Sequence, residues 1–321
     1  MAQKKIVVVG SINLDLVTSV ARLPTVGETL TGQQFATYSG GKGANQAVCV
    51  ARLGGNVSMV GRLGEDRFAV ELRENLQAAG VQTDGIENVT GPSGTAIILV
   101  TSEAANSIIV VPGANASLRP EDLDRCEALF RDASIVLCQL ETPLDTVEQV
   151  GRITQRLRIP FLLDPAPAFA LSPSLLRTVT WLTPNESECR ILLHSLGHPP
   201  RATESDLPAE AAAKLLLDAG VRNLILKLGS RGFYIAGRDV EPTYVSSFQV
   251  KAVDTTAAGD AFNGGFAYAL AHVGLDPLSA ARFANAVAAI SVTRAGAQSS
   301  MPQLAEVQAL LARGRNLPTY P

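Results

Sequence analysis

The chain has 321 residues, of which 46% are hydrophobic, and it can bury the core of one large domain. Its formal net charge of −3 and the absence of any Lys/Arg run longer than two argue against a nucleic-acid partner, which needs a basic face. No apolar stretch reaches the roughly 18 residues of a transmembrane helix, and the apolar run after Lys5 is too short for a signal-peptide core. We therefore expect a cytoplasmic protein that binds neither nucleic acid nor membrane.

The cysteines show no C-x-x-C spacing and lie in apolar or helical patterns, at Cys49, Cys126, Cys138 and Cys189. They are predicted to be reduced thiols rather than a disulfide framework or a zinc site.

Short apolar runs alternate with helical patterns over most of the chain. The predicted strands are 6–10, 57–60, 135–138, 161–163, 179–182 and 224–228. The predicted helices between them are 43–53, 68–79, 144–157, 186–193 and 209–219. The C-terminal third adds β runs at 232–236 and 240–245, then helices at 260–272 and 277–294. This order predicts an α/β fold with a central, mainly parallel sheet flanked by helices.

Two segments break the alternation. Residues 12–38 and 94–111 are rich in Thr, Val and Ile and lack helical periodicity. We interpret them as a small β-sheet lid inserted in a single α/β domain over residues 1–321. Residues 194–207 are predicted to form a surface loop.

Polar residues follow the ends of the predicted strands, where ligands bind in open α/β sheets. These residues are Asn13, Asp15, Gln139, Glu141, Asp164, Asn185, Glu186, Gly229 and Ser230. Asn13 and Asp15 are two apart, so in an extended strand they share one face and can bind adjacent sugar hydroxyls. The alternative is an Asx turn, in which both side chains bond their own backbone.

The run Gly40-Gly41-Lys42-Gly43-Ala44-Asn45-Gln46 is predicted to open a helix. Its glycines allow close backbone approach. It is not a Walker A loop, because Ala36 stands where the first glycine belongs and Gly43 where Ser or Thr belongs. Gln46 likewise excludes a dinucleotide fingerprint. A tight strand-to-helix turn is the alternative.

Small residues from Val253 to Gly259 run directly into the helix that contains Asp260. Consecutive N–H groups at such a helix start can bind an anion. A carboxylate beside an anion hole suits phosphoryl transfer to an alcohol, since it accepts the hydroxyl proton while the hole stabilises the transferring group. Alternatively, Asp260 only caps the helix.

Together these motifs resemble the ribokinase (PfkB) family of carbohydrate kinases. The amino-terminal signature is 40–45 and the carboxyl-terminal one is 254–260, with Thr183-Pro184-Asn185-Glu186-Ser187-Glu188 and Lys227-Leu228-Gly229-Ser230-Arg231-Gly232 between them in the family order. Asn13-x-Asp15 and the run Gly296-Ala297-Gln298 are most similar to the ribose-specific members. One departure is Ala257, where the broad family usually has glycine.

The resemblance implies ATP-dependent phosphorylation of D-ribose at the 5-hydroxyl to ribose 5-phosphate, with Asp260 as base. The alternatives are a sister kinase acting on 2-deoxyribose, fructose or a nucleoside, and a non-catalytic sugar sensor. The resemblance also implies a homodimer that forms through the lid.

Site residues follow from the same resemblance. Sugar would be held by Asn13, Asp15, Gly41, Lys42, Gly43, Asn45, Glu141 and Asp260. ATP with Mg²⁺ would lie along Asn185, Glu188, Lys227, Gly229, Ser230, Gly232, Gly259 and Asn285. The anion hole would comprise the backbone of Ala257, Ala258 and Gly259. A monovalent cation, usually K⁺, would be held, partly by carbonyls, by Asp254, Thr256, Ser291, Arg294, Gly296 and Ser300.

Overall fold

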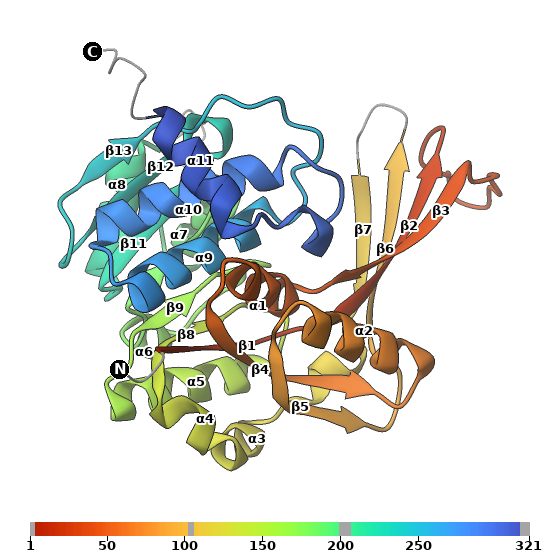
Figure 1. Ribbon diagram of the computed structural model, residues 1–321, viewed down its shortest axis with the longest axis horizontal. Coiled ribbons are helices and arrows are strands. Elements are labelled where there is room, and N and C mark those ends of the chain that lie inside the picture. Colours follow the sequence, from red (N-terminus) through yellow and green to blue (C-terminus); the bar gives the residue numbers. More distant parts are fainter. Residues whose placement is uncertain (1–3, 102–105, 199–206, 315–321) are drawn as a thin grey trace.

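The alternating apolar runs form one large sheet in the computed structural model, which describes residues 4–101, 106–198 and 207–314. Within these ranges the sheet has nine strands in the order β13-β12-β11-β10-β9-β8-β1-β4-β5 (Figure 1). The pairs from β5 to β11 are parallel, and β12 and β13 are antiparallel. The strands are β1 (Lys5–Val9), β4 (Asn56–Gly64), β5 (Gln82–Val89), β8 (Ala133–Cys138), β9 (Phe161–Leu163), β10 (Trp181–Leu182), β11 (Asn223–Lys227), β12 (Phe233–Gly237) and β13 (Thr243–Val245).

Both faces of this sheet are covered, because its central strands carry buried apolar residues on each side. In β1, Ile6 and Val8 belong to one hydrophobic core, and Val7 and Val9 to the other, as the two-residue period of a strand requires. The first core is completed by α1 (Lys42–Arg52), α2 (Arg67–Ala78), α9 (Ala258–Ala267), η3 (Tyr268–Val273), α10 (Pro277–Ser291) and α11 (Leu304–Gly314). The second is completed by α3 (Pro120–Arg125), α4 (Glu127–Arg131), α5 (Leu144–Leu157), α6 (Pro173–Leu176), α7 (Glu186–Ser195) and α8 (Ala209–Asp218). The predicted fold class is confirmed.

Several predicted boundaries were wrong. β5 was missed because it is an edge strand whose exposed positions carry polar residues, so it has no apolar run. β13 begins at Thr243 rather than at 240, and β10 is limited to two residues. The helix predicted for 260–272 changes to a π-helical turn, η3, after Ala267. α7 continues to Ser195, inside the predicted loop.

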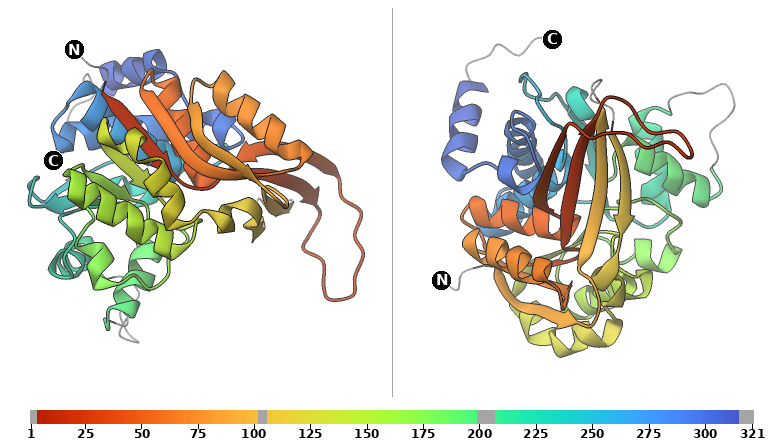
Figure 2. Two further views of the ribbon diagram at one scale, coloured as in Figure 1. Left: turned by 90° about the horizontal axis from the view of Figure 1, so that it is seen from below. Right: turned by 90° about the vertical axis from the view of Figure 1, so that its right-hand side faces the viewer.

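A second, mixed sheet projects from the main body in the order β3-β2-β6-β7. Its strands are β2 (Asn13–Val20), β3 (Gln34–Gly40), β6 (Gly94–Thr101) and β7 (Asn106–Val111). Residues 21–33, inside the predicted lid, form no strand and extend from the molecule as a long connection (Figure 2). Residues 102–105 of the predicted lid and 199–206 of the predicted loop lie outside the described residues. In the described ranges, no helix is long and apolar enough to cross a membrane.

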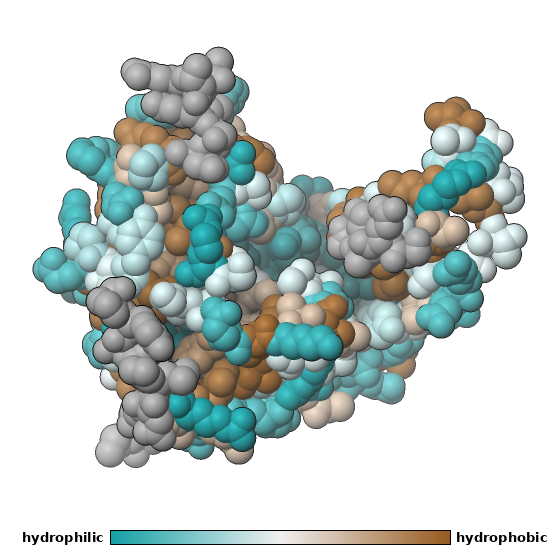
Figure 3. Space-filling view, turned by 90° about the horizontal axis from the view of Figure 1, so that it is seen from above, coloured by the Kyte–Doolittle hydropathy of each residue, from teal (hydrophilic) through white to brown (hydrophobic). Residues whose placement is uncertain are grey.

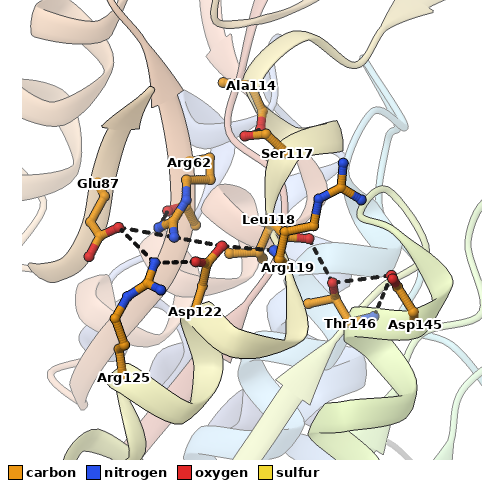
Figure 4. A network of polar contacts seen from close by, with 11 residues as sticks. Arg62, Glu87, Ala114, Ser117, Leu118, Arg119, Asp122, Arg125, Asp145 and Thr146 are labelled. Atoms are coloured by element: carbon orange, nitrogen blue, oxygen red, sulfur yellow. Dashed lines mark hydrogen bonds and ion pairs between the residues drawn. The ribbon is translucent and has the colours of Figure 1, made fainter. Parts of the chain in front are cut away.

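A buried arginine forms an ion pair with α3, the helix that follows the lid strands in the chain. The Arg62 guanidinium lies 2.7 Å from Asp122 Oδ2 and 3.0 Å from Glu87 Oε2 (Figure 4). Asp122 also accepts a hydrogen bond from Arg119 N–H at 2.8 Å. The buried Arg62 and Asp122 charges neutralise each other, so their ion pair can hold α3 against β4. The turn η1 (Gly113–Ser117), which precedes α3, is held in place with it.

Candidate active site

The glycines before α1 lie against the crossing from β1 to β2. Gly41 has a left-handed φ of 88°, and a Cβ there would come within 2.8 Å of Ser11 O and Asn13 N. A Cβ at Gly43 would come within 2.7 Å of the Gly10 backbone. Only glycine therefore fits, and the contact brings the start of α1 to the end of β1.

Asn13 and Asp15 lie in β2, paired with Gly40 and Tyr38 of β3. The Asx-turn alternative is therefore wrong. Asn13 Oδ1 accepts a hydrogen bond from Asn115 Nδ2 at 2.7 Å, and Asn115 Oδ1 accepts one from Ile12 N–H at 2.9 Å. Asn115 was missed, because no local pattern connects a turn after β7 with a residue about a hundred positions earlier.

Acidic side chains from three parts of the chain converge here. Burial, followed by the charges of Glu141 and Asp260, raises the pKa of Asp15 to about 7. Glu141 accepts a hydrogen bond from Lys42 N–H at 3.2 Å. Burial alone would lower the pKa of Lys42, but Asp260, Asp164 and Glu141 together raise it above its ordinary value. A charged lysine among carboxylates can hold a polyhydroxylated ligand from both sides.

Asp260 is buried in the first turn of α9. Its carboxylate accepts hydrogen bonds from Asn45 Nδ2 at 2.9 Å and Gln46 Nε2 at 3.1 Å. These hydrogen bonds come from α1 rather than from its own helix, although an acid in the first turn of α9 also favours the helix dipole. Burial raises its pKa to about 6, although Lys42 opposes the shift. The group is thus a stronger base than an exposed aspartate.

The segment before α9 has free N–H groups at the predicted anion hole. Ala257 adopts φ 58° and ψ 15°, a conformation that favours glycine, which accounts for the glycine usual in the family. In the part of the chain that the structure describes, the N–H groups of Ala257 and Gly259 have no acceptor. Ala258 N–H instead donates to Thr255 O at 3.2 Å, so it is not free as predicted.

A cavity of about 430 Å³ extends from Asp260 and Lys42 over the carboxyl ends of the neighbouring strands. It is lined by every predicted nucleotide residue: Asn185, Glu188, Lys227, Gly229, Ser230, Gly232, Gly259 and Asn285. Phe248 and Val250 add an apolar wall that sequence reasoning missed, since their loop carries no motif. A wide hollow separates the main body from the lid (Figure 3).

Asn185 and Glu188, which belong to the family motif at 183–188, form a capping box at the start of α7. Asn185 Oδ1 accepts from Glu188 N–H at 2.9 Å, and Glu188 Oε2 accepts from Asn185 N–H at 2.7 Å. Burial raises the pKa of Glu188, against the effect of Lys227. Lys227 Nζ also lies 3.0 Å from Asp164 Oδ1. Asp164 was noted at a strand end but was not predicted as a site residue.

The predicted cation residues lie in two segments, 254–256 and 291–300. Asp254 accepts from Thr256 N–H at 2.9 Å and from Gly296 N–H at 2.8 Å, which joins the two segments. The hydroxyls of Ser291 and Ser300 donate to carbonyls of their own turns, so their lone pairs stay available. Arg294 points its guanidinium at Glu306, and only its carbonyl could serve a cation.

Known proteins share these features over nearly the full chain. A model described as pfkB family carbohydrate kinase matches residues 3–304. The chain is 42% identical over 310 residues to a ribokinase of Bacillus subtilis (strain 168), covering 96% of this chain and 100% of the relative. It is 38% identical over 309 residues to a deoxyribokinase of Salmonella typhi, covering 96% of this chain and 98% of the relative.

A solved structure of an Arabidopsis thaliana ribokinase complexed with ribose and ATP is similar too. It has a TM-score of 0.87 at 36% identity, covering 97% of this chain and 99% of that one. The resemblance inferred from the motifs is confirmed. The chain belongs to the pfkB family of carbohydrate kinases.

Proposed function

We propose that this kinase transfers the γ-phosphate of ATP to the 5-hydroxyl of D-ribose, with Asp260 as the base. One observation carries the proposal: Asp260 lies where the nucleotide-sized cavity meets the sugar-side cluster of Asn45, Lys42 and Asp15. The ribokinases among its relatives support ribose as the acceptor.

In this mechanism the protein mainly positions two substrates. Asp260 accepts the proton of the attacking hydroxyl, and its raised pKa of about 6 suits that task. The free N–H groups of Ala257 and Gly259 stabilise charge on the transferring phosphoryl group. Lid closure over the sugar would exclude water, which otherwise competes as acceptor.

The proposed reaction would use two cations, Mg²⁺ with ATP and a monovalent K⁺. In the described ranges, no group of three or more His, Cys, Asp or Glu could hold a metal. Mg²⁺ would therefore arrive mainly on the phosphate oxygens and compensate their charge, near Glu188 and Asp164. K⁺ would be held by Asp254 and by oxygens of the turn around Gly296.

Sugar specificity tests the assignment. We expect a higher kcat/KM for ribose than for 2-deoxyribose, because a pocket that hydrogen-bonds a hydroxyl leaves polar groups unpaired when that hydroxyl is missing. Asn13→Met should reduce the ratio of the two kcat/KM values, because it lowers kcat/KM for ribose. ADP release is measured with ribose, 2-deoxyribose, fructose and adenosine at saturating ATP–Mg²⁺.

The panel separates the alternatives. A preference for the deoxy sugar would favour the activity named for the Salmonella relative. Ribose binding without ADP release would indicate a sugar sensor. Asn56→Met is the matched control, because Asn56 lies at the opposite, amino-terminal end of a main-sheet strand.

We also propose a homodimer formed through the lid of a single domain spanning 1–321, with the lid in 12–38 and 94–111. Apolar side chains are exposed on the lid strands, including Phe35, Ile108 and Ile109.

The free thiols of the four cysteines, none of which forms a disulfide, support a reducing, cytoplasmic location.

The lid interface predicts that Ile109→Lys dissociates the dimer, because a charge would be buried in an apolar contact. Sedimentation velocity measures the mass of the wild type and of this variant. Val70→Lys is the control, since Val70 is similarly exposed but lies on α2. A monomeric wild type, or equal dissociation by both variants, would contradict the proposal.

A further inference from the structure

The side-chain amide of Gln46 lies between the two buried carboxylates of the site. Gln46 Nε2 donates to Asp260 Oδ1 and to Asp164 Oδ2, each at 3.1 Å. Asp260 belongs to the sugar side, whereas Asp164 pairs with Lys227 of the nucleotide cavity. One amide group therefore uses both of its N–H bonds on two acids from different halves of the site.

The orientation of this amide is fixed by a second one. Gln46 Oε1 accepts a hydrogen bond from Gln139 Nε2 at 2.7 Å. Gln139 Oε1 is buried and has no hydrogen-bond partner among the described residues. Leaving a carbonyl oxygen unpaired is costly, so the arrangement persists only because a flipped Gln139 would place two oxygens face to face.

The two hydrogen-bonded side-chain amides of Gln46 and Gln139, called the amide ladder below, fit against the main chain at the end of β1. A Cβ on Gly10 would lie 2.1 Å from Gln139 Oε1 and 2.9 Å from Gly43 Cα. Gly10 is thus the residue that lets Gln139 reach Gln46 beneath α1. Gln46 and Gln139 are both buried, at 0% and 1% exposure, so solvent cannot replace the hydrogen bonds they make.

We propose that Gln46 is a positioning residue that keeps Asp260 ionised and directs its carboxylate toward the acceptor hydroxyl. The inference rests on the proposed function, in which Asp260 is the base. A donor to the charged form of an acid favours that form. Gln46 also shields Asp260 from Asp164, whose charge opposes ionisation of Asp260.

Other charges face Asp260 as well. Lys42, on α1, favours its ionised form. Asp15, on β2, interacts with it unfavourably. The Cys49 thiol lies close by on α1, and burial together with the charge of Asp260 raises its pKa. Because all of these stay in place when Gln46 is replaced, a change in the ionisation of Asp260 reports on the amide.

The test is the pH profile of kcat at saturating ribose and ATP–Mg²⁺. Under these conditions the bound sugar hydrogen-bonds Asp15, so the acid limb, which is the fall in kcat at low pH, reports the protonation of Asp260. Gln46→Met should move that limb upward by about one pH unit, the size expected from losing a hydrogen bond to a charged group. Gln46→Glu should move it further, because a third acid joins the pair, with kcat recovering as pH rises. KM for both substrates should change little.

Cys49→Ala is the matched control. Cys49 is equally buried one turn along α1, and its thiol donates to Ala261 O at 3.4 Å, so the change disturbs the packing of α1 on α9 without touching the ladder. Its acid limb should match the wild type. Thermal unfolding and ADP binding verify that each variant is folded.

The outcomes are separable. A wild type that releases no ADP with any sugar overturns the proposed function itself. An active wild type whose acid limb is unchanged in folded Gln46→Met and Gln46→Glu overturns only the role of Gln46. Should Gln46→Met fail to fold, the near-isosteric Gln46→Glu decides, and an equal shift in Cys49→Ala would reduce Gln46 to a packing residue.

Discussion

Asp260→Asn lowers kcat by roughly 10²–10⁴-fold, the range for loss of a general base, while sugar and ATP binding largely survive. The asparagine keeps the shape of the aspartate but cannot accept the hydroxyl proton. Its amide also presents hydrogen atoms toward Asn45 and Gln46, which are donors to the native carboxylate. Steady-state ADP release gives kcat, and calorimetric titration gives the two binding constants.

Asp239→Asn serves as the control for this change. Asp239 also accepts hydrogen bonds, from Arg222 and Asn223. It lies outside the site, at the amino-terminal end of β11. Its kcat should equal that of the wild type. Near-normal turnover by Asp260→Asn would mean that another group accepts the proton.

Replacing sodium by potassium raises the initial rate by up to about 10²-fold, the effect of aligning one donor of an anion hole. The cation does not need to touch either substrate. By ordering Asp254 to Thr256 it would fix Ala257 and the N–H groups that follow. Rates are measured at constant ionic strength and saturating Mg²⁺ in the wild type and in Asp254→Ala, which should lose the activation.

Asp276→Ala controls for the loss of a turn-capping aspartate. Asp276 accepts from Ser279 N–H at the start of α10, as Asp254 does from Thr256 N–H, but it lies away from the Gly296 turn. It should keep the activation. Equal wild-type rates in both salts would argue against the site, and activation that persists in Asp254→Ala would place K⁺ elsewhere.

The sequence predicts the main sheet well because its central strands are buried on both faces and are therefore mostly apolar. Where burial is partial, the signal is lost: β5 has the sequence QTDGIENV, which contains no apolar run, and it was missed. The short helices α3 and α4 were missed as well, because five or six residues are too few for a helical period to be evident.

Some residues of the candidate site could be predicted from the sequence, and others could not. Residues in contiguous glycine-rich motifs, such as Lys42, Gly259 and Asp260, could be predicted because the backbone requirement is local. Asn115 could not be, and neither could the contacts of Gln46 with Gln139, Asp164 and Asp260, since the partners lie 93 or more positions apart in the chain. Side-chain amides in a sheet or helix carry no pattern of their own.

The way the lid is threaded has a consequence for folding. β2 pairs in parallel with β6, from Asn13 opposite Gly94 to Val20 opposite Thr101. The intervening chain includes α1, β4, α2 and β5, so this pairing closes a long loop, whose entropy is lost before any contact compensates for it. Refolding should therefore complete the lid after the main body, and lid amides should exchange with solvent before those of β1. Since Asn13 and Asp15 belong to β2, a newly made chain should complete the proposed sugar-binding strand last, on a body that is already folded.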